Sequence, residues 1–188
     1  CLPVYLPTCL PMIELAPHRK QGLTIASPIL AASGAVGFGY EANGLIALER
    51  FGALVTSPIS LRPRRGARQP RLIELRGGVL LRHGDQNVGW QRALERFGGA
   101  WARSKAPVIV HIAGHVSEMV ELAKRIEGTA GVSGIEMDLE SEEELGLLDA
   151  VRADTELPLI ARLPHGGAGL ARFAVEAGAD VLVCIAPP

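Results

Sequence analysis

The chain has 188 residues, of which 48% are apolar and 21% are charged, so it carries enough apolar side chains for one globular domain and is not a disordered segment. Nineteen Lys and Arg residues against twenty Asp and Glu residues give a formal net charge of −1, which argues against nucleic acids and acidic membranes as partners. No apolar run approaches the about 18 residues that a membrane-spanning helix requires, so we expect no membrane span.

Residues 1–22 differ in composition from the rest of the chain. Four prolines within the first seventeen residues predict an irregular N-terminal arm, to which a small hairpin can be added, and 23–188 are expected to form one domain. A secretory signal peptide is the competing interpretation. However, the positively charged segment with which such a peptide begins is absent, and prolines interrupt the continuous apolar segment that it requires. Three scattered cysteines do not make a disulfide framework, which favours a reducing, cytoplasmic location.

Six short apolar runs, each bounded by Gly or Pro, predict strands. They cover residues 28–32, 53–59, 107–112, 133–137, 158–163 and 180–185. The runs do not alternate apolar with polar residues, which is typical of a parallel sheet buried on both faces. The sequence therefore favours an α/β protein over an antiparallel sandwich.

Segments with helical spacing separate most of these strands. They cover residues 43–50, 88–103, 116–127, 142–153 and 168–176. The βα units have nearly equal lengths apart from one long insertion after the second strand, which favours a (β/α)8 TIM-type barrel over an open doubly wound sheet. Such a barrel typically takes about 250 residues. We therefore expect about six of eight βα units here, and the start at Cys1 and the stop after an apolar run are expected limits of a fragment.

Several motifs at predicted strand ends resemble one known family. They are Ala-Ser-Gly-x-x-Gly-x-Gly at 32–39, Pro-Arg-Leu-Ile-Glu at 70–74, Gly-Gly-Val-Leu at 77–80 and Gly-x-Gln-Asn-x-Gly at 84–89. Over about residues 12–186 the chain resembles the dihydroorotate dehydrogenase family, with its class 1 enzymes nearest. The resemblance implies an FMN-binding barrel, a flavin-dependent dehydrogenase that acts on a CH–CH group and oxidises dihydroorotate to orotate in pyrimidine biosynthesis.

The resemblance also implies which residues contact the flavin. Ala32, Ser33 and Gly34 would offer backbone groups with little side chain in the way of a flat ring. Ser57 stands where the family has a flavin-contacting lysine, and Arg162 takes the place of another, keeping the charge but changing its geometry. The alternatives are that the glycines only turn the chain and that Arg162 is a solvated charge at the barrel rim.

Substrate-binding and catalytic residues follow from the same resemblance. Gln86 and Asn87 would bind the pyrimidine, because an amide both donates and accepts hydrogen bonds. Asp138 replaces a family asparagine, and Ser141 falls where the catalytic Cys or Ser base belongs. The alternatives are that Asn87 caps the next helix and that Ser141 forms a capping box with Glu144.

Departures from the family pattern keep other functions open. Leu81 and Ala186 replace family asparagines, and the chain lacks the loop that covers the substrate, since strand leads directly to helix after Ser141. One alternative is therefore a non-catalytic barrel homologue that binds a ligand or partner. The other is a flavin oxidoreductase acting on another small substrate. A homo-oligomer could complete the barrel.

Histidines and arginines elsewhere carry weaker signals. His111 and His115 are four residues apart, but Gly114 marks a strand end between them, so the helical geometry of a zinc site is missing and we expect no metal. Five arginines in the long insertion are expected to form a solvated or oligomer-facing loop: Arg62, Arg64, Arg65, Arg68 and Arg71.

Overall fold

The computed structural model describes residues 12–39, 41, 44–82, 84, 86–141 and 144–185. Residues 1–11 of the irregular arm predicted over 1–22 therefore lie outside the described residues, as does the substitution at Ala186.

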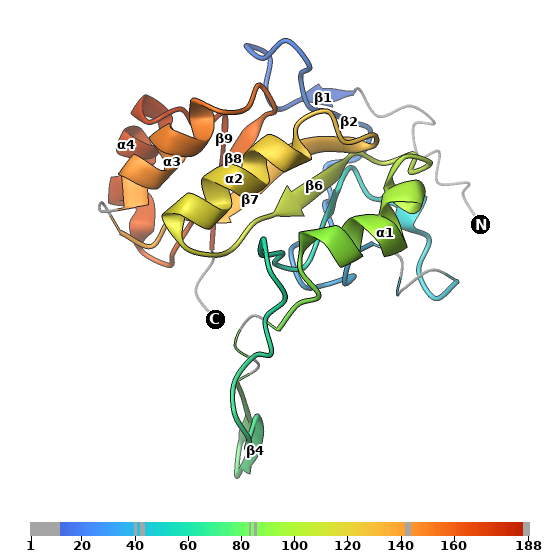
Figure 1. Cartoon of the computed structure of the whole chain (residues 1–188), viewed down its shortest axis with the longest axis vertical. Coiled ribbons are helices and arrows are strands. Elements are labelled where there is room, and N and C mark those ends of the chain that lie inside the picture. The colour runs from blue at the N-terminus through green and yellow to red at the C-terminus, as the bar shows by residue number, and fades with distance from the viewer. Residues whose placement is uncertain are drawn as a thin grey trace, which may run out of the picture.

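A five-stranded parallel sheet forms the centre of the molecule, in the order β3-β6-β7-β8-β9 (Figure 1). Its strands are β3 (Leu54–Val55), β6 (Val108–His111), β7 (Val132–Asp138), β8 (Leu159–Leu163) and β9 (Val181–Cys184). Five of the six predicted strands are thereby confirmed. The first predicted run joins the sheet through a single parallel bridge between Ala31 and Leu54.

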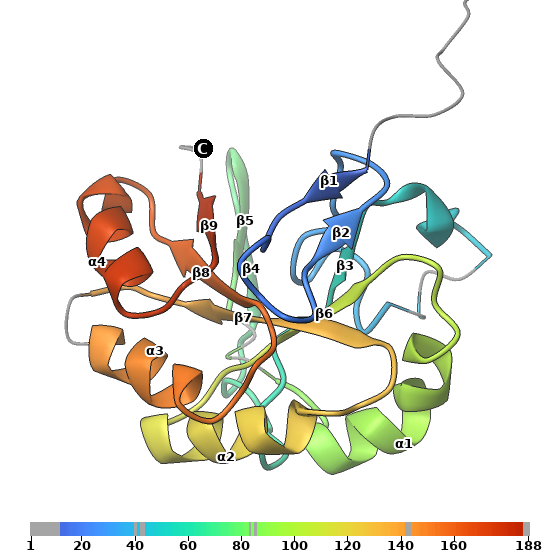
Figure 2. The same ribbon diagram turned by 90° about the horizontal axis from the view of Figure 1, so that it is seen from above.

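Helices cover the outer face of this sheet in an arc (Figure 2). They are α1 (Trp90–Trp101), α2 (Val116–Ile126), α3 (Leu145–Arg152) and α4 (Ala171–Glu176), with a short 3-10 turn, η3 (Gly167–Leu170), before α4. The curled sheet with helices on one face is a partial (β/α)8 barrel and not a doubly wound sheet, which has helices on both faces. Within the described part of the chain, no helix is long and apolar enough to cross a membrane.

The helix predicted over residues 43–50 is wrong for most of its length. Over residues 44–50, the described part of this range, the structure has only a 3-10 turn, η1 (Leu48–Arg50). Gly44 has a φ of +85°, a left-handed conformation through which an α-helix cannot continue.

A small antiparallel hairpin closes the amino-terminal end of the barrel interior. It pairs β1 (Ile13–Glu14) with β2 (Thr24–Ile25) and so joins residues on both sides of the predicted boundary at residue 22. Leu23 and Ile25 pack against Ile109 and Ile160 of the sheet. The inner face is therefore filled by apolar side chains at this end, which we call the floor.

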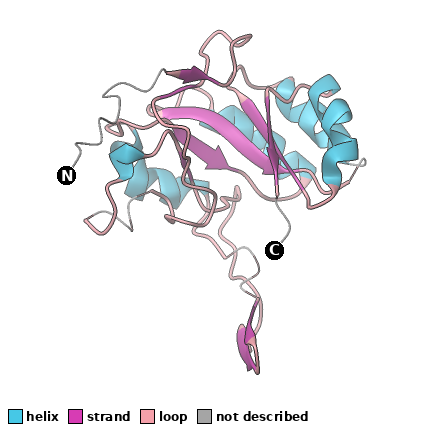
Figure 3. Cartoon of the chain, turned by 180° about the vertical axis from the view of Figure 1, so that it is seen from behind, coloured by secondary structure: helices cyan, strands magenta, loops and turns pink. Residues whose placement is uncertain are grey.

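The long insertion carries a second antiparallel hairpin, made of β4 (Leu72–Leu75) and β5 (Gly78–Leu81). It stands clear of the sheet and the helices on a pair of extended legs, beyond the end of the barrel opposite the floor (Figures 1 and 3). We call residues 72–81 the projecting hairpin.

Candidate active site

Charged side chains occupy the inner face of the sheet at the carboxyl ends of three neighbouring strands. His111 of β6 pairs in register with Glu136 of β7, and Asp138 of β7 pairs with Arg162 of β8. Because side chains alternate along a strand, His111 lies on the same face as Ile109, and Arg162 on the same face as Ile160. The inner face thus changes from apolar at the floor to charged at the carboxyl edge, and we call these four residues the charge cluster.

The charge cluster is a continuous chain of contacts. His111 Nδ1 lies 2.8 Å from Glu136 Oε1, and His111 Nε2 lies 3.6 Å from Asp138 Oδ2. Arg162 donates through two nitrogens to the Asp138 carboxylate, with 2.8 Å between Nη2 and Oδ2. His111 and Glu136 are buried, whereas the Asp138 side chain is 40% exposed. The cluster therefore runs from the protein interior to a carboxylate that solvent or a ligand can reach.

These contacts shift the acid–base behaviour of the cluster. Burial alone lowers the pKa of His111, but the hydrogen bonds and charges of Asp138 and Glu136 outweigh it and raise the pKa. Burial alone raises the pKa of Asp138, but His111 and Arg162 lower it far below its usual range. The hydrogen bond to Asp138 raises the pKa of Arg162. The His111 ring thus lies between the Glu136 and Asp138 side chains, which favour its protonated form, and Asp138 remains a hydrogen-bond acceptor.

The first strand–helix loop lies beside the cluster. Ser33 Oγ donates to the Thr56 carbonyl over 2.9 Å, and Thr56 Oγ1 accepts the backbone N–H of His111 over 3.1 Å. Gly34 has a φ of +85°, and nothing lies within 4 Å of the place where its Cβ would stand. The loop therefore presents open backbone at the carboxyl edge, where barrel enzymes place their sites.

One pocket at this edge brings together residues from three distant segments. Its volume is about 420 Å³, and it is lined by Gly34, Phe38, Ser57, Pro58, Gln86, Asn87 and Val88. Two of these are predicted flavin contacts and two are predicted substrate contacts. The roles themselves stay predictions, but four of the predicted residues share one cavity.

Asn87 is buried, and its side-chain oxygen is fully used by the protein. Asn87 Oδ1 accepts from the Ser60 N–H over 3.2 Å, from Ser60 Oγ over 2.9 Å and from the Gly89 N–H over 2.9 Å. Gly89 immediately precedes α1, so this oxygen supports the helix start. Gln86 is exposed, and its side-chain oxygen accepts from Arg71.

Replacing Asn87 by alanine is therefore expected to lower the free energy of unfolding by about 2 kcal/mol, because the buried N–H groups of Ser60 and Gly89 lose their acceptor. Asn87→Asp keeps an oxygen at the same position and serves as the control, with a smaller loss. Urea unfolding followed by circular dichroism measures both. Equal losses in the two variants would show that the accepting oxygen does not stabilise the fold.

Of the remaining predicted site residues, Asp138 lines another pocket, and Ser141 lines neither. This cavity has a volume of about 250 Å³, and its lining includes Arg64, Asp138, Glu140 and Glu144. The Ser141 N–H donates to Glu144 Oε2 over 3.3 Å, and Glu144 immediately precedes α3. A glutamate that reaches back to backbone N–H groups at a helix start is half of a capping box. The role of Ser141 as a base stays a prediction.

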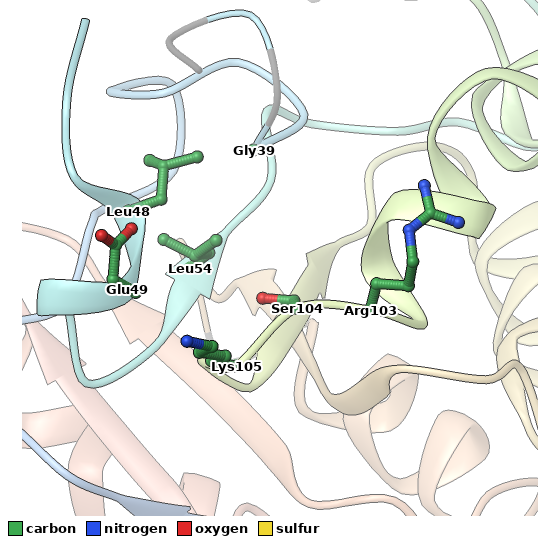
Figure 4. Close-up of a pocket in the computed structure, with 7 residues that line it drawn as sticks. All are labelled: Gly39, Leu48, Glu49, Leu54, Arg103, Ser104 and Lys105. Carbon is green, nitrogen blue, oxygen red and sulfur yellow. The ribbon is translucent and has the colours of Figure 1, made fainter. Parts of the chain in front are cut away.

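Another pocket lies at the opposite end of the sheet (Figure 4). It has a volume of about 200 Å³ and is lined by Gly39, Leu48, Glu49, Leu54, Arg103, Ser104 and Lys105. Ser104 and Lys105 precede β6, so this pocket opens at the amino-terminal edge. None of the predicted site residues lines it, and we therefore assign the candidate site to the carboxyl edge.

From the sequence, His111 was considered only as a zinc ligand, and Glu136 was missed because it lies inside an apolar run. The available signal was their register: each of three successive predicted strands carries an ionisable side chain near its carboxyl end. Such residues are rarely fully buried unless they are paired, so their presence in three neighbouring core strands indicates a cluster.

Comparisons with known proteins agree with this architecture. A family model described as dihydroorotate dehydrogenase matches residues 18–158. A relative from Desulforudis audaxviator, named dihydroorotate dehydrogenase B (NAD(+)), catalytic subunit, is 35% identical over 182 residues, which cover 87% of this chain and 59% of the relative. A protein of the same name from Endomicrobium trichonymphae is 41% identical over 119 residues, covering 63% of this chain and 39% of the relative.

A solved structure matches the fold over nearly the whole chain. DHODH from Eimeria tenella, in complex with ferulenol, superimposes with a TM-score of 0.67 at 18% identity and covers 96% of this chain and 61% of its own. At this identity the likeness shows the fold alone, and it confirms the partial (β/α)8 barrel. The chain spans about three fifths of the length of the first relative and of this structure.

Proposed function

The chain belongs to the dihydroorotate dehydrogenase family, and from this membership we propose that it carries the flavin and pyrimidine sites of an FMN-dependent enzyme that oxidises dihydroorotate to orotate. The family is flavin-dependent. The observation that supports the proposal most strongly is the pocket at the carboxyl edge, where Gly34 and Ser57 meet Gln86 and Asn87. These residues come from three loops that the barrel brings together.

The residues present fit the ring part of FMN. At Gly34 a side chain is absent and the space is open, so a flat ring can lie against the backbone of 32–34. The Ser33 hydroxyl is already held by the Thr56 carbonyl. FMN, when bound here, supplies the acceptor for the hydride equivalent that leaves the substrate CH–CH group.

The protein's own residues supply orientation and charge. Arg162 is fixed by two hydrogen bonds to Asp138 and stays protonated, so it provides a constant positive charge at the carboxyl edge. Gln86 and the side-chain NH2 group of Asn87 would orient the pyrimidine. Ser141, which is exposed, would accept the proton that leaves the carbon next to the one losing hydride, while its own hydroxyl proton passes to solvent.

A second candidate function is the oxidation of another small substrate at the same flavin site. Asp138 favours it, because a carboxylate with a strongly lowered pKa accepts hydrogen bonds but cannot donate them. The asparagine of the family does both. A substrate with an additional N–H or ammonium group would match Asp138 better than dihydroorotate does.

The relatives named as catalytic subunits also suggest a partner. We propose that the natural protein assembles with a second subunit and passes electrons onward to NAD(+). Reduction of NAD(+) by substrate in the co-expressed complex, but not by this protein alone, is the expected result.

The flavin site can be tested with two matched glycine variants. Gly34 and Gly44 both have a φ of +85° and open space at the Cβ position, but only Gly34 lines the candidate pocket. Gly34→Leu is therefore expected to lower FMN affinity at least about tenfold, a loss of about 1.4 kcal/mol, while Gly44→Leu keeps it. Flavin absorbance and fluorescence titration of the full natural protein measure the difference.

Three outcomes separate the candidate functions. A folded, colourless natural protein that does not take up added FMN would contradict every flavin function and leave the non-catalytic homologue. Flavin that is bound but not reduced by dihydroorotate would favour another substrate. Reduction by dihydroorotate that is lost in Ser141→Ala, with flavin still bound, is the result expected for the first candidate.

A further inference from the structure

Arginines are concentrated in the two legs that connect the projecting hairpin to the barrel. We call residues 61–71 and 82–89 the basic legs, because they contain six arginines and one acidic residue, Asp85. The rest of the chain contains thirteen Lys and Arg residues against nineteen Asp and Glu residues. The positive charge is therefore gathered in one part of the molecule, although the whole chain is close to neutral.

Most of these arginines are not used by the fold. Four are exposed and form no ion pair with an acidic side chain of the described residues: Arg62, Arg65, Arg68 and Arg82. The Arg71 side chain differs, because it donates to two backbone carbonyls and to Gln86 and so ties the legs together. Like charges that lie close together repel one another, so the four exposed arginines do not stabilise the fold. Their accumulation points to a negatively charged ligand.

The basic legs begin and end beside the candidate site. They leave the barrel on the side away from the floor (Figure 3). A backbone bridge joins Arg64 of one leg to Asn87 of the other. Gln86 and Asn87 line the pocket of about 420 Å³ at the carboxyl edge, and Arg64 lines the neighbouring one. The unpaired positive charge is therefore attached to the segments that form these pockets.

The two pockets differ in how well they suit an anion. The lining of the larger pocket contains no charged side chain, so nothing in it opposes the positive charge of the legs. The lining of the smaller pocket contains Asp138, Glu140 and Glu144, which repel an anion. Positive charge beside a cleft raises the local concentration of anions. A long polyanion such as a nucleic acid would extend over the acidic remainder of the chain, so a small anion fits better.

We propose that the basic legs concentrate small anions at the opening of the pocket lined by Gln86 and Asn87, and that a carboxylate substrate benefits from this field. The inference rests on the proposed function, because dihydroorotate carries a carboxylate that is ionised at neutral pH. Two positive charges about 10 Å from a monoanion raise its local concentration about threefold at low ionic strength, and salt screens the effect.

The first test compares two matched double variants of the full natural protein. Arg62→Gln with Arg65→Gln removes two charges from the legs and is expected to raise KM for dihydroorotate about threefold at low ionic strength, with kcat unchanged. Arg50→Gln with Arg103→Gln is the control. These arginines are also exposed, but Arg50 precedes β3 and Arg103 lines the pocket at the amino-terminal edge. The control should keep the wild-type KM, and in about 0.5 M salt all three proteins should agree.

The second test does not depend on activity. In a full natural protein whose own cysteines are replaced by serine, Val88→Cys places a thiol in the lining of the larger pocket. The rate of its reaction with dithiobis(nitrobenzoate), a dianion, is divided by the rate with neutral dithiodipyridine. The thiolate fraction cancels in this ratio, which therefore reports the local field. The leg variant is expected to lower the ratio at least about fivefold, and the control pair should leave it unchanged.

The two tests separate a failure of this inference from a failure of the proposed function. A natural protein that does not oxidise dihydroorotate contradicts the proposed function, and the thiol ratio still decides whether the basic legs concentrate anions. A ratio that the leg variant leaves unchanged, or that the control pair lowers equally, overturns the inference. A lowered ratio with an unchanged KM overturns it as well, because the field then does not act on the substrate.

Discussion

His111→Leu is expected to lower the free energy of unfolding by about 3–5 kcal/mol below a pH of about 6.5, where His111 is protonated, because removing one member of a buried ion pair leaves the other without a partner. Here the stranded group is Glu136, which is buried and 2.8 Å from the imidazole. Denaturant unfolding of the variant beside wild type measures the loss. A double variant, His111→Leu with Glu136→Leu, removes both charges and should recover most of the stability.

The same ion pair predicts how stability depends on pH. A histidine whose pKa is raised on folding contributes stability that is complete below its ordinary pKa of about 6.5 and is lost as pH rises through the raised value. Wild type should therefore lose stability on the alkaline side of that pH, and His111→Leu should lack this decline. If both proteins show the same pH profile, the imidazolium is not the group responsible.

Gly131→Ala is expected to cost about 4 kcal/mol or more, or to prevent folding. Gly131 precedes β7 and lies against the last turn of α1, where an added Cβ would stand 2.2 Å from the Trp101 carbonyl carbon and oxygen. Both neighbours are backbone atoms, so no side-chain rotation relieves the clash. The φ of +85° adds the strain that any residue with a Cβ carries there.

Gly128→Ala separates the steric clash from the backbone strain as causes of the loss in stability. Gly128 also has a positive φ, +74°, but nothing lies within 4 Å of its added Cβ. Its substitution should cost only about 1–2 kcal/mol, the conformational strain alone. Thermal unfolding of the two variants measures the difference. Equal losses would mean that the α1 end can move away from Gly131, and the clash would then not determine stability.

The parallel sheet was predictable because burial on both faces leaves a strong mark in the sequence. Runs such as Val108-Ile109-Val110 are apolar throughout and are bounded by Gly or Pro, so both their hydrophobic pattern and their short length indicate buried strands. The projecting hairpin was not predicted, because its residues fell in what was read as a long insertion. The apolar residues of the hairpin are exposed, so the hairpin lacks the contrast between buried and exposed positions by which a sequence pattern identifies a strand.

The candidate site also contains features that the sequence predicts and features that it does not. Gly34, Ser57, Gln86 and Asn87 were found through motifs, and the fold gathers them in one pocket. Asp138 and Arg162 were also named, but as separate contacts to substrate and flavin. Their hydrogen bonds to each other depend on the pairing of β7 with β8, which no local pattern reveals. The same is true of His111 and Glu136.

The charge cluster also bears on how the strands align during folding. A sheet that is apolar on both faces has little to distinguish one register from the next. In β6, β7 and β8 the residues that distinguish the two faces are those of the cluster, since Ile109 and Val110 are equally suited to either side. A slip of one residue in β7 would turn Glu136 and Asp138 toward the helices, among Leu148 and Met119. The cluster therefore penalises misaligned strands, and its loss should slow folding and populate misregistered states as well as alter the site.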